Sequence, residues 1–379
     1  MQCIVRRLPI ALMLSVFSTP AVAQAATQAT IAQLEQFLAS KRVQKESDKD
    51  VALQLSSVTL LEQLTESTLA RIESEAQLGP QTEEQLQLLA AESIFSAPPA
   101  TEWIGGPTPD GDAQRRMLEA ARLYVNHTLR QLPDFLATRT TLSLDNLGDA
   151  PMASPGQREA PLHFSREYRQ EVTFRNGREM DASDLAGRGG ATYDSISPAG
   201  LTTWGEFGPI LTIVLSDSFQ GSVTWSRWQR SESGTSVAVF AYSIPESASH
   251  YSIDFCCYQK SADDPSDAHF RAQPGYRGEI YLDPATGAID RITLEADLGE
   301  NDPVIASGIA VQYGYVDIAG KPYLCPVRGV AVSEVHNYQM ESVVKLGTEK
   351  HVNIVRFTGY HKFGSTARVL AGGSGHGPR

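Results

Sequence analysis

Hydrophobic positions along the chain follow two different periods, and the change of period divides the chain into two parts. At residues 30–91 apolar side chains recur every three to four positions, as on one face of a helix. After Pro133 the period falls to two, which is typical of a strand with one buried face. The pattern therefore predicts an α+β protein, with a helical region at residues 26–96 and a large antiparallel β domain at residues 112–365.

Residues 97–111 separate the two parts, because this stretch is rich in proline and glycine, which interrupt regular structure. The pattern before it predicts three or four short helices. A long helix is expected from residue 112 to about residue 132, where Pro133 ends it. Residues 366–379 are rich in glycine and predict a disordered tail.

About ten strands are expected after the long helix, joined mostly by tight turns. The turn signals stand at Asn176-Gly177, Asp283-Pro284-Ala285-Thr286-Gly287 and Ala319-Gly320-Lys321-Pro322. The apolar run Pro209–Leu215 fits either a buried strand or a helix with proline in its first turn, and we favour the helix. Residues 184–200 and 259–275 are expected to form long loops. The expected fold is thus a curved antiparallel sheet wrapped around one or two helices.

The N-terminus has the three parts of a cleavable secretory signal. Arg6 and Arg7 precede a short apolar stretch, and small residues follow up to Ala25. The apolar stretch is too short to cross a bilayer, which takes about 20 residues. We expect residues 1–25 to be a signal peptide cleaved after Ala23 or Ala25, and the mature chain to be periplasmic or extracellular.

Composition and charge narrow the classes of partner. The chain is 41% hydrophobic and 20% charged, as in an ordinary globular protein, and its formal net charge is −12. Loss of residues 1–25 removes Arg6 and Arg7 and no acidic residue, which changes −12 to −14. An acidic surface repels nucleic acid, and Lys and Arg are scattered along the sequence, so we expect no nucleic-acid partner.

The cysteines permit one disulfide in an exported protein. Cys3 would leave with the signal peptide, and Cys256, Cys257 and Cys325 would remain. Adjacent residues of a strand point to opposite faces, so only one of the neighbouring pair can comfortably face Cys325. We favour Cys257 with Cys325, and Cys256 is the alternative to Cys257. No Cys-x-x-Cys motif indicates a redox or zinc site.

The sequence carries no recognised motif for catalysis, metal binding or cofactor binding. The chain has no Gly-x-Ser-x-Gly, His-Glu-x-x-His or phosphate-binding loop motif, and its histidines are isolated. Asp263 to Asp267 read as a solvated acidic loop rather than a calcium site. Glu206 is either a buried acid with a raised pKa or, as we favour, a cap for the helix at Pro209. We therefore name no catalytic residue, metal ligand or cofactor.

Apolar and aromatic residues around the Pro209 segment are the one candidate for a ligand site. The candidate cavity residues are Trp204, Phe207, Ile210, Leu211, Val214, Trp225, Trp228 and Phe240. Such a cluster can hold an acyl chain, a sugar or a peptide, although an ordinary aromatic core explains the same residues.

The strand-turn-strand segment at residues 278–292 carries a resemblance to a known group of proteins. Its Asp-Pro-x-Thr-Gly turn, together with the preceding Leu-Pro helix end and the meander, resembles the LolA/LolB/RseB-like lipoprotein-carrier superfamily over residues 112–365. The same segments are similar to uncharacterised exported bacterial proteins. The resemblance implies a half-barrel that leaves an apolar cavity for acyl chains.

The functional expectation follows from export, architecture and the motifs. We expect a non-enzymatic envelope protein that binds an apolar or amphipathic ligand, such as a lipid or a lipoprotein acyl chain; peripheral contact with a membrane fits that role. The alternative is a structural or interaction module with a solid core that binds a partner through the N-terminal helices. A hydrolase that uses scattered carboxylates and histidines is the third hypothesis.

Overall fold

The computed structural model describes residues 27–76, 78–146, 162–180, 206–231, 234–261, 264–338 and 345–362. The helices of this part are α1 (Ile31–Gln44), α2 (Asp48–Leu55), α3 (Glu66–Ala76), α4 (Pro80–Glu92), α5 (Gly111–Gln131) and α7 (Pro209–Asp217). Two short 3-10 helices occur at Ala100–Glu102 and Glu246–Ala248. The N-terminal signal, the 184–200 loop and the C-terminal tail expected from the sequence lie outside the described residues. In the described part, no helix is long and apolar enough to span a membrane.

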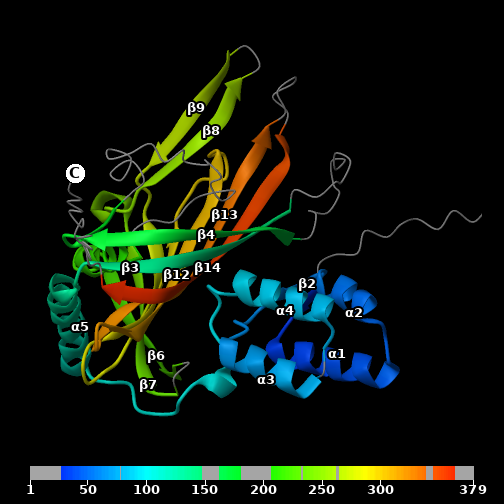
Figure 1. The fold of residues 1–379 in the computed structure, drawn as a ribbon, viewed down its shortest axis with the longest axis horizontal. Helices are drawn as coiled ribbons and strands as arrows, with labels where there is room; N and C mark the ends of the chain where they lie inside the picture. Colours follow the sequence, from blue (N-terminus) through cyan, green and yellow to red (C-terminus); the bar gives the residue numbers. More distant parts are fainter. Residues whose placement is uncertain are drawn as a thin grey trace, which may run out of the picture.

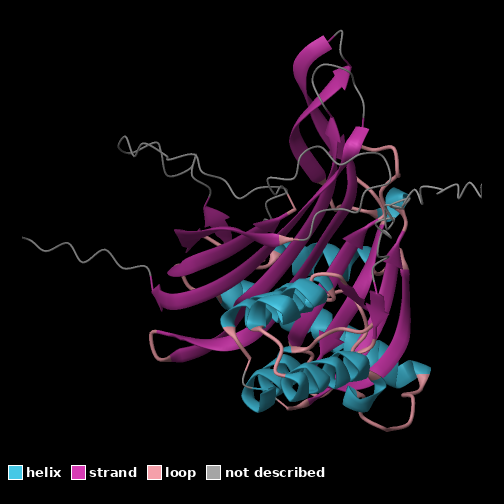
Figure 2. Cartoon of the chain, turned by 90° about the vertical axis from the view of Figure 1, so that its right-hand side faces the viewer, coloured by secondary structure: helices cyan, strands magenta, loops and turns pink. Residues whose placement is uncertain are grey.

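Ten strands form one antiparallel sheet, which confirms the α+β class (Figures 1 and 2). In their order across the sheet they are β5 (Arg178–Met180), β4 (His163–Arg175), β3 (Phe135–Asp145), β14 (Lys345–Lys362), β13 (Lys321–Tyr338), β12 (Val304–Ile318), β11 (Ile289–Ala296), β10 (Tyr276–Leu282), β7 (Ser236–Ile244) and β6 (Ser222–Arg230). Most neighbours are consecutive hairpins, as expected. The pairing of β3 with β14 joins segments about 200 residues apart, which no local pattern predicts.

The N-terminal helices form a compact unit around their own core. Leu34, Leu55, Leu64 and Leu86 are each at most 2% exposed at its centre. Thr30 begins α1 with a capping box, accepting from Gln33 N while its own N–H donates to Gln33 Oε1. The unit also contains a parallel strand pair, β1 (Thr27–Ala29) with β2 (Val58–Leu60), which the helical reading of the sequence did not include.

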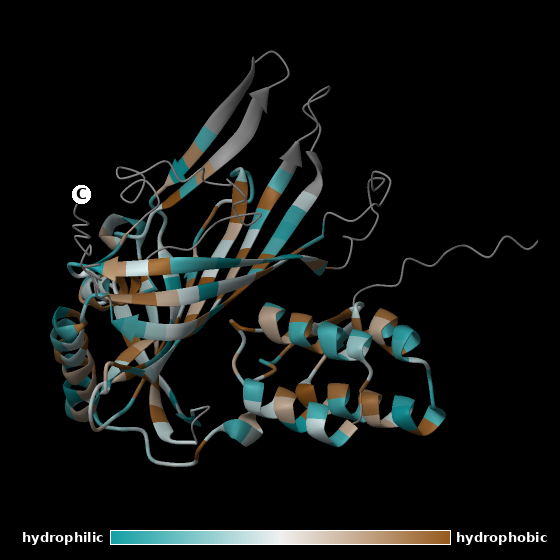
Figure 3. Ribbon diagram, viewed as in Figure 1, coloured by the Kyte–Doolittle hydropathy of each residue, from teal (hydrophilic) through white to brown (hydrophobic). Residues whose placement is uncertain are grey.

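The sheet carries helices on both of its faces. Along β12, Ile309 and Val311 belong to the core beneath α5 and α7, while Ala310 belongs to a second cluster with the end of α4. That second cluster includes Ile94 and the partly buried Phe95. Figure 3 shows hydrophobic and hydrophilic residues alternating along the strands. The helical unit therefore lies directly against the sheet.

The Pro209 run is a helix, α7, as favoured from the sequence. Pro209 occupies its first turn, where the missing N–H removes no helical hydrogen bond. Gly208 precedes it with φ +148°, and a Cβ there would lie 2.7 Å from a methyl group of Leu129 on α5. Glycine at this position lets α7 start close against α5.

A glycine in the hairpin turn between β10 and β11 allows α5 to approach the sheet closely as well. Gly287 has φ +78°, and a Cβ there would lie 2.4 Å from the carbonyl carbon of Ala120. The backbone of α5 therefore rests on the Asp283–Gly287 turn, which this glycine keeps free of a side chain.

One stretch expected to be a loop is regular. Residues 259–275 were expected to be mobile, but most of them belong to a hairpin of β8 (Ile253–Ser261) and β9 (Asp264–Ala272), a separate two-stranded sheet. Backbone pairing between the two segments supplies the order that the polar sequence of β9 did not indicate.

The favoured disulfide is not formed in this structure. Cys325 is a free thiol, 1% exposed, and burial raises its pKa to about 12. It packs among Phe135, Val355 and Phe357 in the main sheet, whereas Cys256 and Cys257 belong to the β8–β9 hairpin, outside that sheet. A disulfide needs its two Cα atoms within about 7 Å. The side chains of Cys256 and Cys257 lie outside the described residues.

Candidate functional site

An apolar slot lies between α5, α7 and the sheet. Its walls are Tyr124, Val125, Thr128, Leu129, Leu132, Phe207, Leu211, Tyr313, Leu324 and Pro326. Counted out into the open solvent at its mouth, it spans about 310 Å³. The slot is narrow, with room for about one water molecule between the side chains. Almost all of its lining is carbon, so it can hold an apolar group and offers little to a polar one.

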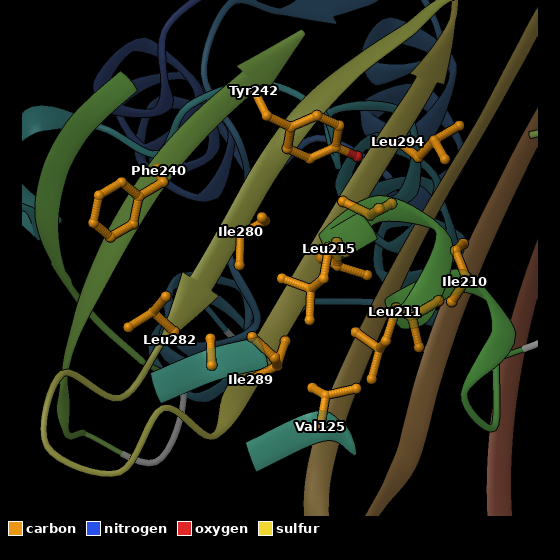
Figure 4. Packing of buried hydrophobic residues seen from close by; sticks show 14 of the residues in the cluster. Val125, Ile210, Leu211, Leu215, Phe240, Tyr242, Ile280, Leu282, Ile289 and Leu294 are labelled. Carbon is orange, nitrogen blue, oxygen red and sulfur yellow. The ribbon is translucent and has the colours of Figure 1, made fainter. Parts of the chain in front are cut away.

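The structure divides the predicted cavity residues. Leu211 and Phe207 line the slot, while Ile210, Val214 and Phe240 are packed inside the core, each at most 5% exposed (Figure 4). Figure 4 shows Leu211 and Leu215 of α7 lying over the sheet that carries Ile280, Ile289 and Leu294, all of one buried cluster. Leu211 and Phe207 are themselves only 4% and 2% exposed, so the core interpretation, which the sequence left open, applies to five of the eight predicted residues.

Two of the three predicted tryptophans, Trp225 and Trp228, do not line the slot. Trp225 and Trp228 lie on the edge strand β6, with ring centroids 4.8 Å apart, and Trp228 Nε1 donates to Pro107 O at 3.0 Å. Both are partly buried against the main core. Trp204 lies outside the described residues.

Most slot residues were not predicted, because they come from distant parts of the sequence. Leu129 and Leu132 belong to the last turn of α5 and the residue after it, and Leu324 and Pro326 belong to β13. The sequence marks the α5 residues as one side of an amphipathic helix, but only the fold shows that Leu324 faces them.

A buried charge cluster lies next to the slot. Glu206 is 1% exposed, and its Oε1 accepts a hydrogen bond from Arg139 Nη2 at 3.1 Å. The backbone carbonyl of Glu206 accepts from the hydroxyl of Tyr313, a slot residue. Glu206 does not cap α7, whose first residue is preceded by Gly208 with no side-chain cap. The favoured capping role is therefore wrong, and Glu206 instead joins α7 to β3.

Glu179 on β5 completes this cluster. Burial, and next the negative charge of Glu206, raises the pKa of Glu179 to about 7. Its Oε2 is buried with no hydrogen-bond partner among the described residues. Two carboxyl groups and one guanidinium thus share a buried site in which Glu179 changes protonation near neutral pH. No sequence motif marks Glu179, because its neighbours come from β3 and from the start of α7.

Within the described residues, no three His, Cys, Asp or Glu side chains are grouped so as to hold a metal ion. His250 Nδ1 lies 2.6 Å from Asp217 Oδ1, and the hydroxyl of Tyr276 donates to Asp217 Oδ2 at 2.8 Å. Asp217 is the last residue of α7 and is 1% exposed. These contacts tie the end of α7 to β10, which is a structural role. Of the acidic loop expected at Asp263 to Asp267, residues 264–267 belong instead to β9, and their side chains lie outside those that the structure describes.

The chain matches no protein-family model, no curated protein and no solved structure. Function is therefore argued from the site itself.

Proposed function

We propose that the protein is an exported, non-enzymatic envelope protein that binds an apolar or amphipathic ligand, such as a lipid or a lipoprotein acyl chain. In this proposal the curved sheet acts as a half-barrel, and α5 and α7 close its concave side. The apolar slot carries the proposal, because it opens to solvent and is lined almost entirely by carbon. Each methylene group buried there contributes about 0.8 kcal/mol to binding.

The weak attachment of α5 supports ligand entry. Of its 21 residues, only Ala121 and Val125 are buried. Its contacts with α7 and the sheet are otherwise made by half-buried side chains such as Met117 and Leu129. Because so few of its side chains are buried, α5 can separate from its neighbours at less cost than unfolding of the whole protein. An acyl chain is wider than the closed slot, so we propose that α5 moves outward to admit it.

A second candidate function is partner binding through the N-terminal helices. Val43 and Leu53 are 82% and 67% exposed on the helical unit, and Leu61 is 53% exposed after β2. Apolar side chains this exposed suit contact with another protein. Replacing the three with lysine is expected to abolish recovery of an envelope partner and to leave ligand binding in the slot unchanged.

The slot is tested by titrating the mature protein with a fluorescent fatty acid. Thr128 lies half-buried at the slot, so Thr128→Trp fills the opening without replacing a core residue. We expect this variant to bind the fatty acid at least about tenfold more weakly, equivalent to two buried methylene groups.

Leu123→Trp is the matched control, since Leu123 lies on the same helix and is 57% exposed. It should bind like the unchanged protein. Equal affinity of both variants would remove the slot from the proposal, and no saturable binding to the unchanged protein would refute the proposed function.

A further inference from the structure

A second pocket, polar in character, lies where the helical unit meets the sheet. Counted out into the solvent at its mouth it spans about 350 Å³, and the space between its side chains has a volume of about 30 Å³. Thr65 and Ser67 line it from the start of α3, Glu102 from the segment that follows α4, and Arg230, Arg291 and Gln312 from the sheet. Pockets between two structural units are common ligand sites. Nothing in the apolar slot or its proposed ligand involves this pocket.

Arg291 is the buried cation of the pocket. It is 6% exposed, stacks over the ring of Tyr281 at 5.2 Å, and donates through Nη2 to the carbonyl of Ile94. In the described residues this is its only hydrogen bond, and no carboxylate lies within ion-pair distance. Burying a cation without a paired anion is costly. The remaining donors of its guanidinium are thus available to a ligand.

Arg227 contacts the same tyrosine ring as Arg291, but its charge is paired with a carboxylate. It stacks on Tyr281 at 5.7 Å, and its Nη1 and Nη2 donate to the two oxygens of Glu279 at 2.5 and 2.8 Å. Glu279 thus forms a bidentate pair with Arg227, whereas it acts on Arg291 only through its charge, with no hydrogen bond between the two in the described residues.

Strand pairing extends the positive charge beyond Arg291. Gln312 is opposite Arg291 on one side and opposite Arg328 on the other, and Arg328 is opposite Arg356. Cross-strand partners have Cβ atoms about 5 Å apart on the same face. Burial, and next the charge of Arg356, lowers the pKa of Arg328 to about 10, and its Nε is buried without a partner in the described part. Glu66 is the single carboxylate paired with Arg328 there.

The carboxylates near the pocket do not neutralise Arg291 directly. Glu102 Oε1 accepts from the hydroxyls of Thr65 and Thr68, at 3.0 and 2.8 Å. Burial raises the pKa of Asp290 to about 6. The residue between the two arginines is an uncharged glutamine, so the chain itself supplies no anion at that point.

We propose that this pocket binds the oxyanion of a small ligand, a carboxylate or a phosphate group, between Arg291 and Gln312. The guanidinium provides a planar pair of N–H donors and the amide of Gln312 provides another. Two arginines in one cross-strand row supply the charge in a chain that is otherwise acidic.

The test is calorimetric titration of the full mature chain with sodium phosphate and, separately, with sodium acetate, each against sodium chloride of equal ionic strength. Gln312→Glu puts a carboxylate opposite Arg291 with almost no change of shape. This carboxylate should pair with the guanidinium and so compete with an added anion. We expect at least about tenfold weaker binding in this variant and in Arg291→Gln, as loss of a charge-assisted hydrogen bond implies.

Arg277→Gln is the control, because Arg277 is 61% exposed on β10 and faces Glu295. It should bind like the unchanged protein. Binding of phosphate alone would assign a phosphate ligand, and binding of acetate alone a carboxylate. Absence of saturable binding to either salt, or unchanged affinity in Gln312→Glu, would overturn the proposal. Because Gln312→Glu keeps every buried contact of Arg291, its result stands even if Arg291→Gln fails to fold.

Discussion

Gly287→Ala is expected to destabilise the protein by about 3 kcal/mol. A side chain at φ +78° costs about 1 kcal/mol, and the new Cβ would overlap the backbone of α5 at Ala120, where it would be only 2.4 Å from the carbonyl carbon. Because the obstacle is backbone, the whole helix must shift. Urea unfolding followed by circular dichroism measures the loss, and the displaced helix should also change fatty-acid affinity.

Gly320→Ala measures the cost of the positive φ alone, without the overlap with α5. Gly320 has nearly the same φ, +81°, in the turn between β12 and β13, and a Cβ there would meet nothing within 4 Å. We expect this variant to lose only about 1 kcal/mol. Equal losses in the two variants would mean that α5 does not rest on the Asp283–Gly287 turn.

Arg139→Met is expected to cost about 4 kcal/mol at pH 8. The change removes the guanidinium that lies 3.1 Å from Glu206 and leaves that carboxylate buried with Glu179 beside it. Unfolding by urea at pH 8 and at pH 5 measures the effect. The deficit should be smaller at pH 5, where Glu179 is protonated and no longer repels Glu206.

The pH dependence of this deficit follows from the raised pKa of Glu179. Its pKa is about 7 in the folded protein and ordinarily 4.5, so the folded state binds more protons between these values. The contribution of Glu179 to the free energy of unfolding is therefore fully present below pH 4.5 and is lost as the pH rises through 7. Arg122→Met is the control, because Arg122 and its partner Glu119 are 41% and 47% exposed and such pairs contribute at most about 1 kcal/mol. An Arg139→Met deficit that is equal at both pH values would exclude Glu179 from the cluster.

Local patterns in the sequence predicted most of the fold. Asn176 and Gly177 form the hairpin turn they indicated, with φ of 53° and 76°, and Pro209 begins α7. Both features depend on a few adjacent residues whose backbone preferences are strong. The β8–β9 hairpin was missed because β9 lacks the apolar alternation that identifies a strand.

The candidate sites depend on pairings that no local pattern contains. Arg291 and Arg328 are far apart in the sequence and are brought into one row only by the register of β11, β12 and β13. The slot likewise combines α5 with β13. Scattered arginines and separate apolar runs in the sequence thus became a charged row and an apolar slot through long-range packing.

Native mass spectrometry of the protein purified from its own envelope tests ligand binding most directly. We expect a chain that begins at residue 24 or 26, carrying a bound lipid that is present with Leu123→Trp and lost with Thr128→Trp. A mature chain that carries no lipid when isolated under conditions that preserve lipid complexes would contradict the proposed function.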